Sequence, residues 1–265
     1  MNQMPYNMTR FIRRKLSVVL SSLLLIPFAF GYSSPLSKVK RKASMLISTR
    51  KHAVGKKSNT VELNAHQQVS TYESLELAKL GLSKEAFDYA MKGREYLAAN
   101  GKLQNQDILS IVDFSLPSSK KRLFIVDLKN NKLLFNTYVA HGRGSGNEMA
   151  NEFSNVEDSY KSSLGFYITG DTYNGKHGLS MRLFGQDKGF NDNANDRAIV
   201  MHSAAYVSEE TIKQQGYIGR SHGCPAVPEE LNKPIIETIK NGTCLFLYSP
   251  DKQYAANSTI INTAV

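Results

Sequence analysis

The sequence predicts a β-rich, mostly antiparallel sandwich with short helices and a helical segment on its N-terminal side. Two observations indicate this fold. One stretch near residue 90 has helical periodicity, and the runs after it are short, rich in β-forming residues and separated by Gly, Asn, Asp and Lys turns. Because 41% of the 265 residues are hydrophobic, and only 18 are Gly and 8 Pro, the chain is neither disordered nor collagen-like.

The helical stretch is expected from Ser83 to Asn100. Ser83 is a suitable N-cap, and Gly101 follows the last turn. The apolar residues on its buried face are Phe87, Ala90, Met91, Leu97 and Ala98. The expected strands are 122–128, 132–140, 164–169, 179–183, 198–201 and 243–248. Two short helices are expected at 208–215 and 234–241, the second with Pro234 in its first turn.

The first thirty-one residues have the layout of a secretory signal peptide. Four cations between Arg10 and Lys15 precede an uncharged run over 16–30, and small residues at Ala29 and Gly31 suit a cleavage site. The apolar run is shorter than the roughly 20 residues that a membrane-spanning helix needs, so an uncleaved anchor is the weaker interpretation. We therefore expect an exported protein of the periplasm or cell envelope.

The basic charge of the chain is confined to its N-terminal part. The formal net charge is +10, yet no Asp or Glu precedes Glu62, and residues 58–265 carry 21 Lys and Arg against all 23 Asp and Glu. The folded body is therefore not expected to bind nucleic acid. Residues 32–70 are interpreted as a basic disordered linker, a tether whose alternative role is electrostatic contact with an anionic membrane or wall polymer.

Three further segments complete the expected organisation of the chain. Residues 71–102 form the helical N-terminal segment, 103–250 the main domain, and 251–265 a polar tail. Nothing in the sequence implies an oligomer.

The two cysteines lie in different surroundings. Cys244 belongs to an apolar strand, where a buried thiol is expected. Cys224 lies in a turn-like segment with Arg220 and His222 close by, and these neighbours favour the thiolate, which is the nucleophilic form. A Cys224–Cys244 disulfide is the structural alternative in an exported protein.

A thiol nucleophile needs a base, and His202 is the best candidate because it ends the apolar strand 198–201. His52 and His66 lie in or beside the linker, and His177 is interpreted as part of a surface turn. A zinc site made of His202, His222 and Cys224 is a less favoured alternative, because no Cys-x-x-Cys or His-Glu-x-x-His spacing occurs. We expect neither a metal nor a cofactor.

His202, 18 intervening residues and then Ser221-His222-Gly223-Cys224 resemble the signature of the YkuD-type murein L,D-transpeptidase catalytic domain family. Matches upstream include the segments 140–142, 153–155, 162–165 and 197–202, and the resemblance covers about Leu80 to Tyr248. It implies the sandwich fold of that family. Two departures concern substrate choice. The family has Arg or Asn two positions after the cysteine, where this chain has Ala226 after Pro225, and the spacing from His202 is slightly longer than is common in the family.

The resemblance also implies roles for the residues of the motif. Cys224 would be the nucleophile and His202 the base, held in one tautomer by the backbone of Ser203. Backbone N–H groups of Gly223 and Cys224 would form the oxyanion hole, and His222 would line the site. The candidates for contact with the substrate are Arg220 and Ser221 of the motif. Two further candidates, His141 and Arg143, come from the sequence itself, because they belong to the glycine-rich run 141–146, which is interpreted as a mobile loop near the substrate.

The implied substrate is a peptidoglycan stem tetrapeptide. A thioester on Cys224 would form with release of D-Ala, and an amine from a second stem would resolve it into a 3→3 cross-link. Water as acceptor would make the protein an L,D-carboxypeptidase or another wall-acting cysteine acyl hydrolase. An alternative of a different class is a non-catalytic peptidoglycan-binding module.

Overall fold

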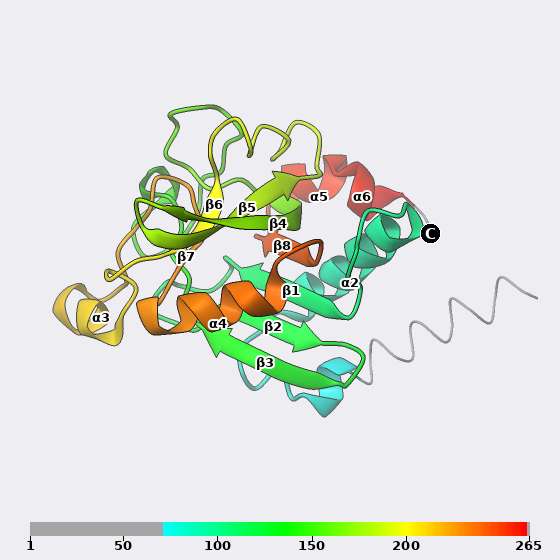
Figure 1. Ribbon diagram of the computed structural model, residues 1–265, viewed down its shortest axis with the longest axis horizontal. Coiled ribbons are helices and arrows are strands. Elements are labelled where there is room, and N and C mark those ends of the chain that lie inside the picture. Colours follow the sequence, from blue (N-terminus) through cyan, green and yellow to red (C-terminus); the bar gives the residue numbers. More distant parts are fainter. Residues whose placement is uncertain (1–70, 264–265) are drawn as a thin grey trace, which may run out of the picture. The chain divides into compact units, whose positions relative to one another are not determined.

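The computed structural model describes residues 71–263 (Figure 1). The predicted signal peptide and linker lie outside the described residues, so the structure gives no information on them. The helices are α2 (Lys84–Ala99), α3 (Glu209–Gln215), α4 (Glu229–Ile239), α5 (Lys252–Asn257) and α6 (Thr259–Asn262), with a short 3-10 helix η1 (Arg143–Ser145). The strands are β1 (Ile108–Asp113), β2 (Leu123–Asp127), β3 (Lys132–Thr137), β4 (Gly165–Gly175), β5 (Gly178–Gly185), β6 (Val200–Ser203), β7 (Ala226–Val227) and β8 (Cys244–Tyr248).

The strands form one eight-stranded sheet in the order β3-β2-β1-β8-β4-β5-β6-β7. Five neighbouring pairs are antiparallel, and only β1 with β8 and β6 with β7 run parallel. The predicted β-rich, mostly antiparallel fold with few short helices is therefore confirmed. The strand β1 was absent from the predicted runs, and it lies near the centre of the sheet beside β8.

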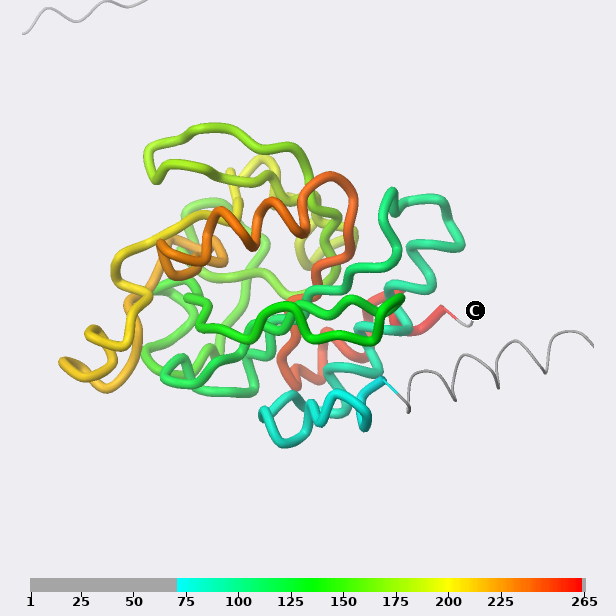
Figure 2. The backbone as a smooth tube through the Cα atoms, turned by 60° about the horizontal axis from the view of Figure 1, so that its bottom comes forward, coloured from blue at the N-terminus to red at the C-terminus, as the bar shows by residue number. Residues whose placement is uncertain are grey.

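Helices cover the sheet and complete the core. Helix α2 packs against β1, β8 and α6, whereas α4 packs against β5 and β6 (Figures 1 and 2). Phe166 of β4 and Phe246 of β8 stack with ring centroids 4.1 Å apart. A Cβ atom at Gly93 of α2 would lie 2.0 Å from the Phe166 ring, so only glycine allows this close approach of the helix to the ring.

The N-terminal helix forms where its caps predict. The Ser83 hydroxyl accepts a hydrogen bond from Ala86 N at 3.2 Å, and Ser83 N donates to Asp113 Oδ2 at 2.9 Å. The cap therefore also fixes the start of α2 to the end of β1. Helix α4 differs from the prediction, because it begins at Glu229 and holds Pro234 in its interior. Pro234 was expected in the first turn of this helix. It lies in the helix interior instead, where it has no backbone N–H to donate to the preceding turn.

The predicted polar tail contains α5 and α6, which bury Tyr254, Ile260 and Ile261 in the core. Their anchor is the carboxylate of Asp187, which accepts hydrogen bonds from Ser258 Oγ at 2.5 Å and from Tyr254 Oη at 3.2 Å. Three apolar residues among polar neighbours gave no amphipathic pattern, which is why the sequence indicated a tail. Within residues 71–263, no helix combines the length and apolarity needed to cross a membrane.

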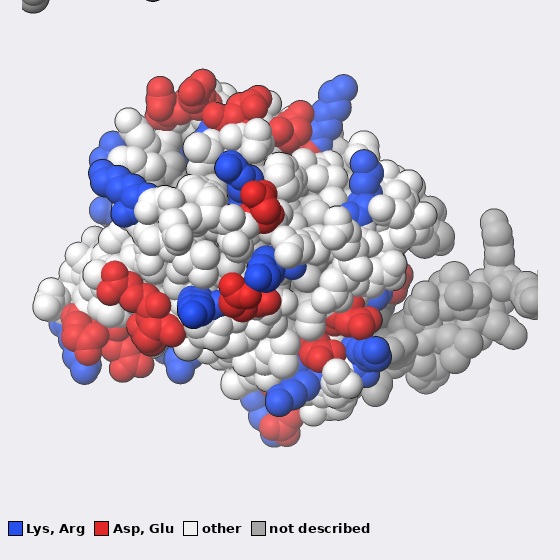
Figure 3. All heavy atoms as spheres, viewed as in Figure 1, with Lys and Arg blue, Asp and Glu red and all other residues white. Residues whose placement is uncertain are grey.

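Acidic and basic side chains intermingle on the face seen in Figure 3, with no single-sign field across it. This distribution is that expected of a body whose Lys and Arg nearly balance its Asp and Glu.

Candidate active site

A cleft of about 470 Å³ lies among the β4–β5 turn, the strand β6 and the loop before β7. Five of the predicted site residues line it: His202, Arg220, Ser221, His222 and Cys224. The turn between β4 and β5 adds Lys176 and His177, and Tyr173 and Tyr206 complete the titratable groups. No Asp or Glu is among the lining residues, so the charged side chains facing the cleft are all basic.

A tight turn presents Cys224 to this cleft. Gly223 has φ +128°, and a Cβ there would lie 2.9 Å from Lys161 O, so the position requires glycine. The Ser221 hydroxyl accepts the Gly223 N–H at 3.0 Å and donates to Cys224 O at 2.6 Å. Ser221, expected to contact substrate, therefore builds the turn with its hydroxyl. The Gly223 N–H, expected in the oxyanion hole, is donated to that hydroxyl.

The Cys224 thiol is half-buried, with Sγ 3.8 Å from Ala198 O. Burial raises the pKa of this thiol, and the N–H of Val200 and the charge of Arg197 only partly oppose the rise. Desolvation therefore outweighs the groups that favour the thiolate, so the thiol is neutral at rest. The nucleophile needs a base at the moment of attack. Cys224 and Cys244 are both free thiols, and Cys244 is fully buried in β8.

His202 is placed to be that base. Its Nδ1 lies 2.8 Å from Ser203 O, the contact expected from the sequence. Because a carbonyl oxygen only accepts, Nδ1 carries the hydrogen and Nε2 keeps the free lone pair. The pKa of His202 is lowered, first by burial and further by the positive charge of His177, so the imidazole is neutral at neutral pH.

His177 belongs to the site, although the sequence indicated a surface turn. Its ring stacks on that of His202, with centroids 4.7 Å apart and planes 25° from parallel. The Ser203 hydroxyl donates to His177 O at 3.1 Å, so Ser203 contacts both histidines. Pairing of β4 with β5 brings this turn to the end of β6, and nothing in the local sequence encodes that approach.

Arg143 and His222 both contact the aromatic ring of Tyr160. The guanidinium of Arg143 lies 4.1 Å from the centre of the Tyr160 ring, and that ring contacts His222 at 4.8 Å edge to face. His222 lines the cleft and Arg143 does not. Arg220 lines the cleft and is held by hydrogen bonds from Nη1 to Gly146 O at 3.0 Å and Asn147 Oδ1 at 2.5 Å.

His141 does not reach the cleft, which corrects its expected contact with substrate. Its side chain is fully buried, with Nδ1 2.7 Å from Arg122 Nη2. The backbone around it pairs with the loop before β7, where Ser221 N donates to His141 O at 2.9 Å. This pairing turns the ring to the interior. Burial and the Arg122 charge lower the pKa of His141 to about 3.

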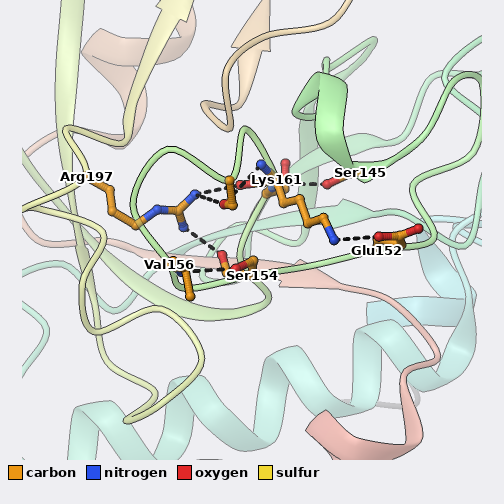
Figure 4. A network of polar contacts seen from close by, with 8 residues as sticks. Ser145, Glu152, Ser154, Val156, Lys161 and Arg197 are labelled. Atoms are coloured by element: carbon orange, nitrogen blue, oxygen red, sulfur yellow. Dashed lines mark hydrogen bonds and ion pairs between the residues drawn. The ribbon is translucent and has the colours of Figure 1, made fainter.

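Arg197 is a second site residue that the sequence did not single out as functional. Its guanidinium donates to Ser154 O at 2.7 Å, Lys161 O at 2.8 Å and Ser159 Oγ at 3.2 Å, and also to Ser163 Oγ (Figure 4). These bonds fasten the loop over 154–163. The loop in turn lies against the nucleophile turn, because Ser162 Oγ donates to Gly223 O at 3.3 Å.

Comparisons with known proteins identify the family of the chain. The model of the L,D-transpeptidase catalytic domain family matches residues 78–248. Among solved structures, an L,D-transpeptidase from Mycobacterium smegmatis is 12% identical, with a TM-score of 0.33, over 54% of this chain and 59% of that one. An L,D-transpeptidase from Stackebrandtia nassauensis is 15% identical, with a TM-score of 0.33, over 62% of this chain and 68% of that one.

The helical cell shape determining protein Pgp2 from Campylobacter jejuni is 15% identical, with a TM-score of 0.35, over 60% of this chain and 56% of that one. The chain spans about half to three-fifths of the length of the first solved structures that it matches. No curated protein matches the chain.

Proposed function

The chain belongs to the L,D-transpeptidase catalytic domain family, and from this premise we propose that it is an exported cysteine acyltransferase that forms 3→3 cross-links in peptidoglycan. The observation that carries the proposal is the shared cleft of Cys224 and His202, in which the contact to Ser203 O leaves His202 Nε2 free to accept a proton. A binding module would need neither a nucleophile nor a base.

The first half-reaction acylates the cysteine. His202 Nε2 takes the thiol proton as Cys224 Sγ attacks the carbonyl carbon of the diamino acid in a donor tetrapeptide. The oxygen becomes negative, and the Cys224 N–H is left to donate to it, since the Gly223 N–H is bonded to Ser221. The C–N bond to D-Ala then breaks, and His202 returns the proton to the leaving amine.

The second half-reaction releases the acyl group. An amine of a second stem loses its proton to His202 and attacks the thioester carbonyl, so that an amide forms and the C–S bond breaks. The Cys224 thiolate takes the proton back from His202. The absence of acidic lining residues suits this step, because a positive environment favours the neutral, nucleophilic form of the amine.

The basic lining also supports stem peptides as substrates. Lys176 and Arg220 face the cleft, and carboxylates of the donor stem are the groups they would bind. Of the two, Arg220 is the better oriented to bind a carboxylate, because Gly146 and Asn147 hold its guanidinium from one side.

The test is mass analysis of a disaccharide-tetrapeptide incubated with the purified protein, beside Cys224→Ala and the matched variant Cys244→Ala. Dimers that lack one D-Ala per link, made by the wild type and Cys244→Ala but not by Cys224→Ala, are the expected result. Monomers shortened by D-Ala alone would instead identify an L,D-carboxypeptidase. Tight binding without any Cys224-dependent product would identify a peptidoglycan-binding module.

Export and retention in the periplasm or cell envelope belong to the same proposal. They rest on the signal-like layout of residues 1–31 and on the substrate, which lies outside the cytoplasm. Mass analysis of the mature protein from the producing cell is the test. An N-terminus at or just after Gly31 supports cleavage and export, and an intact Met1 in a cytoplasmic fraction would contradict both.

A further inference from the structure

We propose that His177 is a positioning residue for His202: its ring, carried on the β4–β5 turn, holds the base by stacking. The inference deepens the proposed function and rests on it, because it assigns the role of base to His202. Nothing in the family signature, which begins at His202, refers to His177.

Three contacts connect His202, Ser203 and His177 in a closed ring. His202 Nδ1–H donates to Ser203 O at 2.8 Å, Ser203 Oγ donates to His177 O at 3.1 Å, and the His177 ring stacks on the His202 ring at 4.7 Å. The hydrogen bond to Ser203 O fixes one edge of the base, and the stack fixes its plane. Together they determine where Nε2 lies, and both imidazoles line the same cleft as Cys224.

The groups around His177 and His202 determine in which direction a charge on His177 shifts the pKa of His202. The other titratable groups that line the cleft are Tyr173, Lys176, Tyr206, Arg220, His222 and Cys224. With no carboxylate among them, a proton on His177 is unbalanced within the cleft. That charge opposes protonation of His202 and contributes to its lowered pKa. A stacked neutral ring, in contrast, presents a polarisable face to the imidazolium that forms during catalysis.

Two substitutions separate stacking from charge. His177→Phe keeps a ring and removes the charge, so kcat/KM at its plateau stays within about twofold of wild type, while the acid limb of the pH profile moves to higher pH. His177→Ala removes both, so the plateau falls about tenfold as the base loses its orientation, and the acid limb also moves up. Asn174→Ala, at an exposed position of the same hairpin and outside the cleft lining, is the control and leaves both quantities unchanged.

A second measurement needs no substrate. Long-range ¹H–¹⁵N NMR of the imidazoles, recorded against pH, reports the tautomer and the pKa of His202. We expect the Nδ1–H tautomer in the wild type and a higher His202 pKa in His177→Phe. An unchanged His202 pKa together with a wild-type pH profile in both His177 variants overturns the proposal.

The two readouts also separate this inference from the function on which it rests. A shifted His202 pKa in a protein that does not turn over stem peptides supports the pairing and contradicts the transpeptidase. Turnover with no shift, and no loss in His177→Ala, contradicts the pairing alone.

Discussion

Arg122 and His141 form a fully buried polar pair, with Nη2 and Nδ1 2.7 Å apart. Because an arginine only donates, His141 Nδ1 must accept, and the ring stays neutral. The pair lies behind the loop that carries Cys224, since His141 O accepts the Ser221 N–H.

This pair predicts a loss of stability in acid. The pKa of His141 is about 3 when folded, against 6.5 for a free side chain, so between these values the unfolded chain binds the extra proton. The free energy of unfolding therefore rises with pH across that window. The contribution is fully present above pH 6.5 and declines as the pH falls toward 3, by on the order of 5 kcal/mol in total.

Urea unfolding between pH 4 and 8 checks this expectation. His141→Gln keeps an acceptor for Arg122 but does not titrate, so its stability should depend less steeply on pH below 6.5. Equal slopes for the two proteins would contradict a neutral, buried His141.

The contacts of Arg197 predict that one residue both orders the loop over 154–163 and favours the reactive form of the Cys224 thiol. Arg197→Gln removes the charge that opposes the raised pKa of Cys224 and several hydrogen bonds to the loop over 154–163. We expect slower alkylation of Cys224 at pH 8, at least tenfold lower kcat/KM, and a loss of about 2 kcal/mol in unfolding free energy.

Two variants make the Arg197 test specific. Arg197→Lys keeps the charge and should retain more of the alkylation rate than of the stability. Arg182→Gln removes an exposed arginine that pairs with Asp171 at 3.4 Å, and it should match the wild type in all three measurements. Equal effects of Arg197→Lys and Arg197→Gln on alkylation would show that the charge plays no part.

The raised pKa of the Cys224 thiol predicts how its rate of alkylation depends on pH. Because burial raises the pKa of this thiol above its ordinary value, iodoacetamide should react slowly at pH 7 and faster as the pH rises. Cys244, whose pKa is raised to about 12 in the core, should be labelled only in denaturant. Mass analysis of peptides after timed labelling measures both, and fast Cys224 labelling at pH 6 would contradict a neutral resting thiol.

The anchoring of the C-terminal helices predicts that two serines, each of which donates to a carboxylate, contribute differently to the free energy of unfolding. Ser258 donates to buried Asp187, whereas Ser119 donates to Glu148 at 2.7 Å on the surface. Ser258→Ala should cost about 1–3 kcal/mol, because a buried carboxylate loses a partner, and Ser119→Ala should cost little. Urea unfolding compares them, and equal costs would mean that Asp187 does not anchor α5 and α6.

Much of the fold was predictable, because it depends on local patterns. Helix α2 was recognisable from its cap and its apolar face, and β2 to β5 from β-forming runs with turns between them. Strand β1 was missed because the polar Ser110 interrupts its apolar run, whereas the apolar runs of β2 and β8 are unbroken. The helices α5 and α6 were missed because their few apolar residues show no amphipathic period.

The site divides in the same way. Cys224, His202 and the contact with Ser203 O follow from the motif, whose members lie close along the chain or on one strand. His177 and Arg197 were not recognised as functional, because their roles depend on how β5, β6 and the loop over 154–163 meet in space. His141 shows the converse: the glycine-rich run 141–146 indicated a mobile loop near the substrate, whereas backbone pairing turned the His141 ring inward.

The position of β8 in the sheet has a consequence for how the chain reaches its native state. Residues 244–248 lie between β1 and β4, so β8 alone joins the two halves of the sheet among the strands of residues 71–263, and it is the last of these strands along the chain. The contacts of β8 with β1 span about half of the chain, which makes folding slow by topology. A growing chain therefore cannot close the sheet until its C-terminal region is available. A delay of this kind keeps the nascent chain unfolded for longer, which is compatible with the export that we propose from the signal-like layout of residues 1–31.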